Sequence, residues 1–213
     1  MESSELERCV HLVGHTLSTK QREQLTSYAA WLADEAIVAG GIGPDEGTRL
    51  WDRHILDSAA FVAVLDDRLQ DGVAIVDIGS GVGLPGIVLA ILLPDTPVTL
   101  LDRSQRRHGL QRRAIRILDL QNCDSLQRDV PAQPVPRGVR VFRASLTPGE
   151  VLSLHVGSQN DHASIVALTR RTDGVLPDDL RTAAAAAGVD VRLHGIGADI
   201  LDSPAWFLSM VTL

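Results

Sequence analysis

Residues 73–86 read Val-Ala-Ile-Val-Asp-Ile-Gly-Ser-Gly-Val-Gly-Leu-Pro-Gly, and they predict the fold of the whole chain. The apolar, β-branched half is typical of a buried strand, and the apolar residues 87–93 that follow indicate a helix. The glycines between them favour a tight turn, because glycine tolerates positive φ and has no Cβ to hold a ligand away from the backbone. Pro85 suits the first helical turn, where no N–H is needed. We therefore predict a strand, a ligand-binding turn and a helix N-terminus.

Two classes of cofactor fit this turn. Residues 81–86 satisfy the G-x-G-x-x-G dinucleotide pattern, and Asp102 follows about 20 residues later. A helix N-terminus would then bind a pyrophosphate. Asp77 at the strand end argues against this, because a carboxylate repels a pyrophosphate and attracts an ammonium group. S-adenosylmethionine carries an ammonium and a sulfonium and no phosphate, so the residues favour this cofactor; a glycine-rich turn without a ligand is the third alternative.

Composition limits the function classes. The chain has 213 residues, enough for one large domain or for a domain with an extension, and its hydrophobic content of 45% is ordinary for a soluble globular protein. The formal net charge of −7 argues against broad, non-specific nucleic-acid binding, although it permits a local basic patch. Cys9 and Cys123 are the only cysteines, so we expect no disulfide framework, no metal site and a reduced, cytoplasmic setting. The acidic first residues do not resemble a signal peptide, and the apolar run 84–93 is too short to span a membrane.

The first third of the chain reads as helical. Leu6, Val10, Val13 and Leu17 recur at helical spacing, and Ser18 or Thr19 is expected to cap a second helix. Residues 37–47 contain several glycines and a proline and are predicted to be a loop. Residues 51–65 carry apolar residues on one face of a third helix. We expect residues 1–69 to form an N-terminal helical cap.

Residues 70–213 alternate between strand and helix patterns, which predicts a parallel sheet with right-handed crossovers. Further strands are expected at 98–102, ending near 127–130, and at 139–145, 164–168, 189–193 and 206–211, with helices from Ser104, at 148–158 and at 177–187. No helix pattern separates the last two strands, so they should pair antiparallel at one sheet edge. This is the class I methyltransferase form of the α/β Rossmann-like fold, with seven strands and the last one antiparallel. The ending argues against a dehydrogenase.

Within that fold the acids at the strand ends have distinct expected roles. Asp102 should hydrogen-bond the ribose hydroxyls, Asp77 should orient the methionine end, and Asp129 with Val130 should contact the adenine edge. The complete predicted cofactor site is Asp77, Gly79, Ser80, Gly81, Gly83, Leu84, Asp102, Arg103, Asp129 and Val130. On the helix after Ser104, three arginines share one side, and they are interpreted either as a solvated face or as a contact to RNA phosphates: Arg112, Arg113 and Arg116.

Two segments carry a specific resemblance. Residues 53–58 read Arg-His-Ile-Leu-Asp-Ser, and the turn continues as Gly-Leu-Pro-Gly-Ile at 83–87, with a Leu-Leu-Asp at 100–102. Over residues 31–128 the chain resembles the bacterial small-subunit ribosomal RNA 7-methylguanosine methyltransferases, also called glucose-inhibited division protein B. The resemblance implies transfer of a methyl group from S-adenosylmethionine to guanine N7 of 16S ribosomal RNA, which would be the partner of this chain.

The chain also departs from that family. Residues 35–43 are unrelated to its Trp-Asn-rich segment, Thr169-Arg170-Arg171 stands where it has a lysine-glycine pair, and Ser203-Pro204 replaces an arginine before the last strand. Arg143 matches its Arg-Ala motif only with a small shift. A divergent paralogue with another substrate, or one that has lost activity, is therefore an alternative.

The chemistry of the implied reaction needs few protein groups. The lone pair of guanine N7 is already free, so no general base, catalytic triad or metal is expected, and the protein contributes orientation and charge placement. The resemblance places His54 and Asp57 facing the methyl donor, and Arg143 could meet an anionic substrate or pair with a carboxylate. A small-molecule methyltransferase, a non-catalytic binding protein and, last, a dehydrogenase are the alternatives.

Overall fold

The computed structural model describes residues 2–65, 72–130, 132–158, 162–168 and 174–213. Within them, seven strands form one sheet in the order β3-β2-β1-β4-β5-β7-β6. The strands span β1 Ile75–Ile78, β2 Val98–Asp102, β3 Cys123–Gln127, β4 Val139–Arg143, β5 Ser164–Ala167, β6 Val189–Ile196 and β7 Ala205–Thr212. Strands β1 to β5 pair in parallel, whereas β7 runs antiparallel to both β5 and β6. The predicted antiparallel ending is confirmed, and β2 has the bounds predicted for it.

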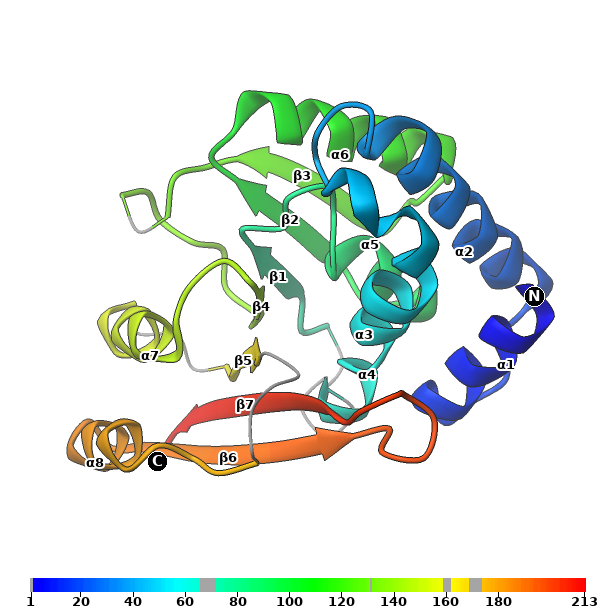
Figure 1. Ribbon diagram of the computed structural model, residues 1–213. Helices are drawn as coiled ribbons and strands as arrows, with labels where there is room; N and C mark the ends of the chain where they lie inside the picture. The colour runs from blue at the N-terminus through cyan, green and yellow to red at the C-terminus, as the bar shows by residue number, and fades with distance from the viewer. Residues whose placement is uncertain (1, 66–71, 131, 159–161, 169–173) are drawn as a thin grey trace.

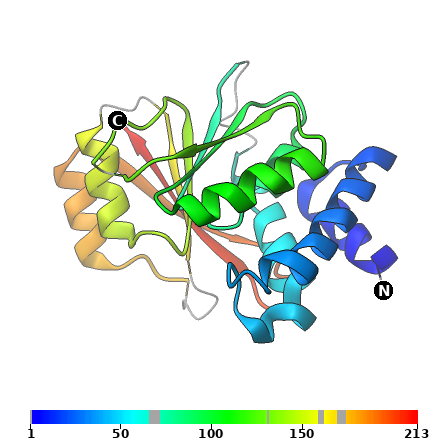
Figure 2. The ribbon, with the colours of Figure 1, turned by 90° about the horizontal axis from the view of Figure 1, so that it is seen from above.

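Helices cover both faces of the sheet (Figures 1 and 2). One face carries α5 and α6 together with the cap helices, and the other carries α7 and α8. Their bounds are α1 Glu2–Val13, α2 Thr19–Trp31, α3 Leu56–Ala59, α4 Val62–Leu65, α5 Gly86–Leu92, α6 Gln105–Ile117, α7 Pro148–Gly157 and α8 Asp178–Ala186. Alternation along β1 explains the two cores, because Ile75 packs toward the cap while Val76 and Ile78 pack toward α7 and α8.

The cap is held to the sheet domain by hydrogen bonds as well as by apolar contacts. Ser18 caps α2 in a capping box with Gln21, as predicted from its position before the helical pattern. The Gln21 side-chain amide also donates to the carbonyls of Ile91 and Leu92 at the end of α5. Cap residues such as Leu25 share one apolar core with α5 and β1. The predicted boundary at 69/70 lies outside the described residues.

Two expectations for the cap need correction. The predicted loop 37–47 ends in a 3₁₀ helix, Pro44–Arg49, which turns Glu46 toward the sheet domain. The predicted third helix is broken into a π-helical turn, Trp51–Ile55, followed by α3 and α4. Helical periodicity alone does not distinguish these tighter and wider turns from an α-helix. Within the described residues, no helix has both the length and the apolar character that crossing a membrane would require.

Helix α6 is capped by Ser104 as predicted, but its buried face differs from the expected one. Ala114 and Leu118 are buried, whereas Ile117, expected to face inward, is 47% exposed. Gln111 is fully buried instead. The helix is therefore rotated so that an amide, not a second aliphatic side chain, faces the glycine turn.

Candidate active site

The glycine turn is held from three directions. The N–H groups of Gly79 and Ser80 both donate to the carbonyl of Leu101 on β2, at 2.8 and 3.0 Å. From α6, Gln111 Nε2 donates to Ser80 Oγ and to the carbonyl of Gly81, both at 2.8 Å. These bonds leave the turn little freedom to adapt when a ligand arrives, so its shape is preorganised.

The cap holds the far end of the turn. The hydroxyl of Tyr28, a fully buried side chain of α2, donates to the carbonyl of Val82 at 3.1 Å. Gly83 packs beneath the turn, where an added Cβ would lie 2.3 Å from Ile87 Cδ1. Gly83 therefore supports the turn from below, and Leu84 from the same segment lines the open side.

Gly81 lies at the exposed side of the turn. It has a φ of +60°, and a Cβ built on it meets nothing within 4 Å. Internal packing therefore does not explain the absence of a side chain at this position. A backbone that a ligand approaches closely does explain it.

Asp77 lies beneath the turn, at the end of β1. Its Oδ2 accepts the N–H of Gly86, the first residue of α5, at 2.7 Å, while its Oδ1 is buried without a hydrogen-bond partner. Burial raises the pKa of this carboxyl to about 7, against the lowering effects of the Gly86 N–H and of Arg143. Asp77 lines neither of the two cavities described below, so its predicted contact with a cofactor remains a prediction.

Asp102 ends β2 beside the turn. Its Oδ1 accepts the N–H of Ser104 at 2.8 Å and its Oδ2 accepts the N–H of Gly81 at 3.1 Å, with Arg107 Nη1 at 3.6 Å from Oδ2. The side chain is only 3% exposed, and it still lines a cavity. A carboxylate held so rigidly at the carboxyl end of a parallel strand is suited to accept hydrogen bonds from a diol.

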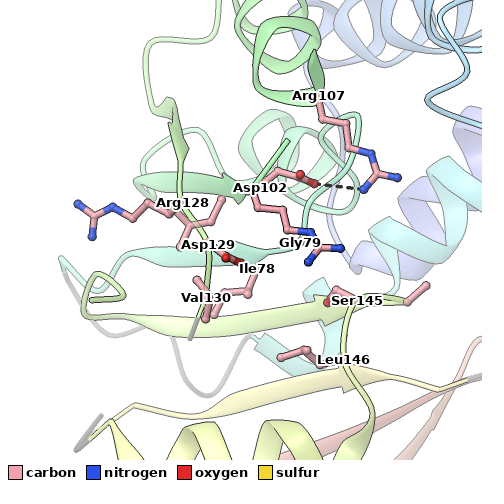
Figure 3. A pocket seen from close by; sticks show the side chains of 12 residues that line it. Ile78, Gly79, Asp102, Arg107, Arg128, Asp129, Val130, Ser145 and Leu146 are labelled. Carbon is pink, nitrogen blue, oxygen red and sulfur yellow. Dashed lines mark ion pairs between the residues drawn. The ribbon is translucent and has the colours of Figure 1, made fainter. Parts of the chain in front are cut away.

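This first cavity, the strand-end cavity, has a volume of about 280 Å³ over the ends of β1, β2 and β4 (Figure 3). Asp102 and Arg107 face one another at its edge, and Arg128 turns outward, donating to the carbonyl of Pro134. Predicted cofactor residues that line it are Gly79, Asp102, Arg103, Asp129 and Val130. Ser145, whose hydroxyl is buried without a partner, also lines it and was not predicted.

A second cavity of about 380 Å³, the cap-side cavity, lies between the cap and the same turn. It shares Gly79, Arg107 and Ala144 with the strand-end cavity, so the two form one continuous crevice. The cap contributes Gly41, Ile42, Gly43, Glu46, Arg53 and His54, and the sheet domain contributes Ser80, Gly81, Val82, Leu84 and Arg143. The two cavities together bring most of the predicted residues to one place.

Two of the three predicted catalytic residues, His54 and Arg143, line the cap-side cavity, and the third, Asp57, does not. Arg143 Nη2 donates to the carbonyl of Arg53 at 2.5 Å and lies 3.3 Å from His54 Nδ1. Burial, and then the charge of Arg143, lower the pKa of His54 to about 4. Burial lowers the pKa of Arg143, and Asp57 opposes this by its negative charge. Asp57 therefore acts on the crevice as a counter-charge from below.

The charge balance of the crevice differs from that of the chain. Besides the outward-turned Arg128, four arginines line the two cavities against three carboxylates, although the whole chain carries −7. Residues 103–116, which run from the crevice along α6, contain six arginines and no acid. The lining residues in question are Arg53, Arg103, Arg107 and Arg143 against Glu46, Asp102 and Asp129. The crevice therefore favours an anionic guest next to a locally acidic strand end.

The residues missed by sequence reasoning act through long-range contacts. Gln111, Tyr28 and Glu46 hold the turn or the cap-side cavity, and none stands in a pattern that marks it. The departure at Thr169-Arg170-Arg171 lies outside the described residues. Ser203-Pro204 lies in the connection before β7. No cluster of three metal-ligating side chains occurs among the residues that the structure describes.

Known proteins match this chain in sequence and in fold. The family profile described as rRNA small subunit methyltransferase G matches residues 21–154. The ribosomal RNA small subunit methyltransferase G of Mycobacterium sp. (strain KMS) is 36% identical over 185 residues, which cover 84% of this chain and 80% of that protein. Its namesake from Corynebacterium glutamicum (strain R) is 29% identical over 88% of this chain and 85% of its own length.

Among solved structures, magnesium protoporphyrin IX methyltransferase from Synechocystis PCC 6803, solved with bound SAH, superposes with a TM-score of 0.59. The match covers 89% of this chain and 100% of the other at 17% identity, a level that speaks for the fold alone. The predicted class of fold, a Rossmann-like methyltransferase sheet, is confirmed.

Proposed function

This chain belongs to the rRNA small subunit methyltransferase G family, and from that premise we propose that it transfers a methyl group from S-adenosylmethionine to guanine N7 of 16S ribosomal RNA in the cytoplasm. The observation that carries the proposal is the crevice itself. It combines a diol-binding carboxylate on β2 with an arginine-rich wall on the cap side. The first suits a nucleoside-containing cofactor and the second suits a polyanionic substrate.

The strand-end residues fit the cofactor. Asp102 would accept hydrogen bonds from the ribose hydroxyls, and the open backbone at Gly81 allows close approach. Asp129 and Val130 would meet the adenine at the other end of the strand-end cavity. The unpartnered Oδ1 of Asp77 leaves negative charge beneath the turn, which suits an ammonium group through water or through the turn. When bound, S-adenosylmethionine supplies an electrophilic methyl group on its sulfonium.

The remaining residues need only orient the acceptor. Guanine N7 has a free lone pair, and His54, neutral at pH 7 because of its lowered pKa, adds no positive charge that would repel a sulfonium. Arg143 supplies a fixed positive charge at the cap-side cavity, and Asp57 balances part of it from below. Positioning of this kind accounts for large rate effects without acid or base chemistry.

RNA is favoured over a small metabolite by the extent of the basic surface. The arginines continue from the crevice along exposed positions of α6, such as Arg112 and Arg116, beyond the reach of a small molecule bound at the turn. A phosphodiester chain would meet both regions at once.

Methyl transfer from labelled S-adenosylmethionine tests the proposal. The acceptors would be small ribosomal subunits, their isolated RNA, transfer RNA and a panel of small metabolites, with nuclease digestion and mass spectrometry to locate the product. We expect 7-methylguanosine in the small-subunit RNA, and no such product with the Arg143→Met variant; Arg192→Gln, an exposed change on β6, is the matched control. Label in a metabolite, or cofactor binding without any turnover, would refute it.

A further inference from the structure

Glu46 joins two residues of the cap-side cavity. The 3₁₀ helix Pro44–Arg49 carries it, and its side chain is 26% exposed. Its two carboxylate oxygens have different partners: Arg53 Nη1 lies 3.4 Å from Oε1, and His54 Nε2 lies 3.2 Å from Oε2. The second contact is the first link of a chain of hydrogen bonds that runs deeper into the crevice.

The direction of this chain follows from the donors. A guanidinium can only donate, so the 3.3 Å contact between Arg143 Nη2 and His54 Nδ1 requires Nδ1 to accept. In a neutral imidazole the other nitrogen then carries the proton, and His54 Nε2–H donates to Glu46. His54 is neutral at pH 7 because burial and the charge of Arg143 lower its pKa to about 4. Glu46 therefore selects the tautomer that can receive Arg143.

We propose that Glu46 is a positioning residue: through the tautomer and orientation of His54 it holds the Arg143 guanidinium at the cap-side cavity for the RNA substrate. This inference rests on the proposed function. The carbonyl of Arg53 fixes the same guanidinium nitrogen from the backbone, so Glu46 supplies the side-chain half of the hold. Hydrogen bonds that orient a functional group from behind have comparable effects in other sites.

A purely structural role for Glu46 makes a different prediction. If its ion pair with Arg53 merely closes the 3₁₀ helix onto the following turn, then Arg53→Met should reproduce the loss seen in Glu46→Ala. Arg53→Met keeps the backbone carbonyl that Arg143 uses, and it leaves the His54 contact untouched. Glu46→Gln is the conservative variant, because its amide oxygen can still accept from His54 Nε2 while the negative charge toward Arg53 is lost.

The experiment compares Glu46→Ala, Glu46→Gln and Arg53→Met in the full chain. Methyl transfer to small-subunit RNA gives kcat and KM, calorimetry gives the affinity for S-adenosylmethionine, and ¹⁵N spectra of the histidines give the tautomer of His54, identified by its absence in His54→Gln. We expect the Nε2–H tautomer in the wild type and a mixture of tautomers in Glu46→Ala, with kcat lowered ~10- to 100-fold. Cofactor affinity should stay within about twofold, since Glu46 does not line the strand-end cavity.

Rescue separates the outcomes. Glu46→Gln and Arg53→Met should both retain the wild-type tautomer and a kcat within about threefold. The inference is overturned if the wild type shows the Nδ1–H or the charged form, if Glu46→Ala keeps the wild-type tautomer, or if Arg53→Met loses as much activity as Glu46→Ala. If the wild type methylates no RNA, the proposed function fails, and the tautomer spectra still decide the role of Glu46.

Discussion

Gly86→Ala tests the packing that places the glycine turn. A Cβ at Gly86 would lie 2.2 Å from Leu100 Cδ2 and 2.8 Å from Asp77 Oδ2, and both of those side chains are fully buried. Overpacking of this kind costs ~1–3 kcal/mol, and displacing Asp77 weakens a hydrogen bond to a charged group worth ~1.5–3 kcal/mol. The helical preference of alanine offsets this by at most about 1 kcal/mol. We expect a net loss of ~2–4 kcal/mol in the free energy of unfolding.

Urea denaturation followed by circular dichroism measures this loss, and Gly109→Ala is the matched control. Gly109 lies within α6, its φ is not positive, and an added Cβ meets nothing within 4 Å. The control should therefore gain ~0.5–1 kcal/mol from the lower backbone entropy of alanine. A loss below about 1 kcal/mol in Gly86→Ala, with the control behaving as expected, would show that the contact between Gly86, Asp77 and Leu100 does not hold the turn.

Three further outcomes follow from the site. The folded pKa of Asp77, about 7, lies above its ordinary value of 3.8, so the folded chain keeps a proton that the unfolded chain releases, and stability should fall as pH rises between about 4 and 7. Asp77→Asn should remove this fall in urea denaturation series; an unchanged slope would contradict the burial effect. Gly81→Ala should cost only ~1–2 kcal/mol of stability, from its φ of +60°, while weakening cofactor binding at least tenfold by calorimetry, ~1.4 kcal/mol; undiminished affinity would show that no ligand approaches there. The double variant Arg112→Gln, Arg116→Gln should reduce the salt dependence of RNA binding by ~0.7–0.9 per lost phosphate contact in filter binding, with Arg181→Gln on α8 as control; an equal effect of the control would indicate a merely general charge effect.

The sheet was predictable because its signals are local. The strand bounds of β2, the caps at Ser18 and Ser104, and the antiparallel pair at the end follow from short patterns of apolar residues and cap residues. The position of Asp102 at a strand end likewise followed from the pattern, and with it half of the crevice.

The other half of the crevice depends on contacts between segments far apart in the chain. Gln111 reaches the turn across 30 or 31 residues, and its burial was not predicted because a glutamine among arginines reads as surface. Glu46 reaches the crevice because the predicted loop folds into a 3₁₀ helix, a choice that local propensity does not determine. Asp77 was expected to face the cofactor directly, and its place beneath the turn results from the first N–H of α5.

Cofactor titration tests the central claim, that the crevice over β1, β2 and β4 is a site for S-adenosylmethionine, most directly. Calorimetry on the wild type should show saturable binding of S-adenosylmethionine at one site and no heat with NADH. Asp102→Asn should bind ~1–3 kcal/mol more weakly, the scale for unpairing a buried polar group. Unchanged affinity in Asp102→Asn, or NADH binding as tightly as S-adenosylmethionine, would contradict it.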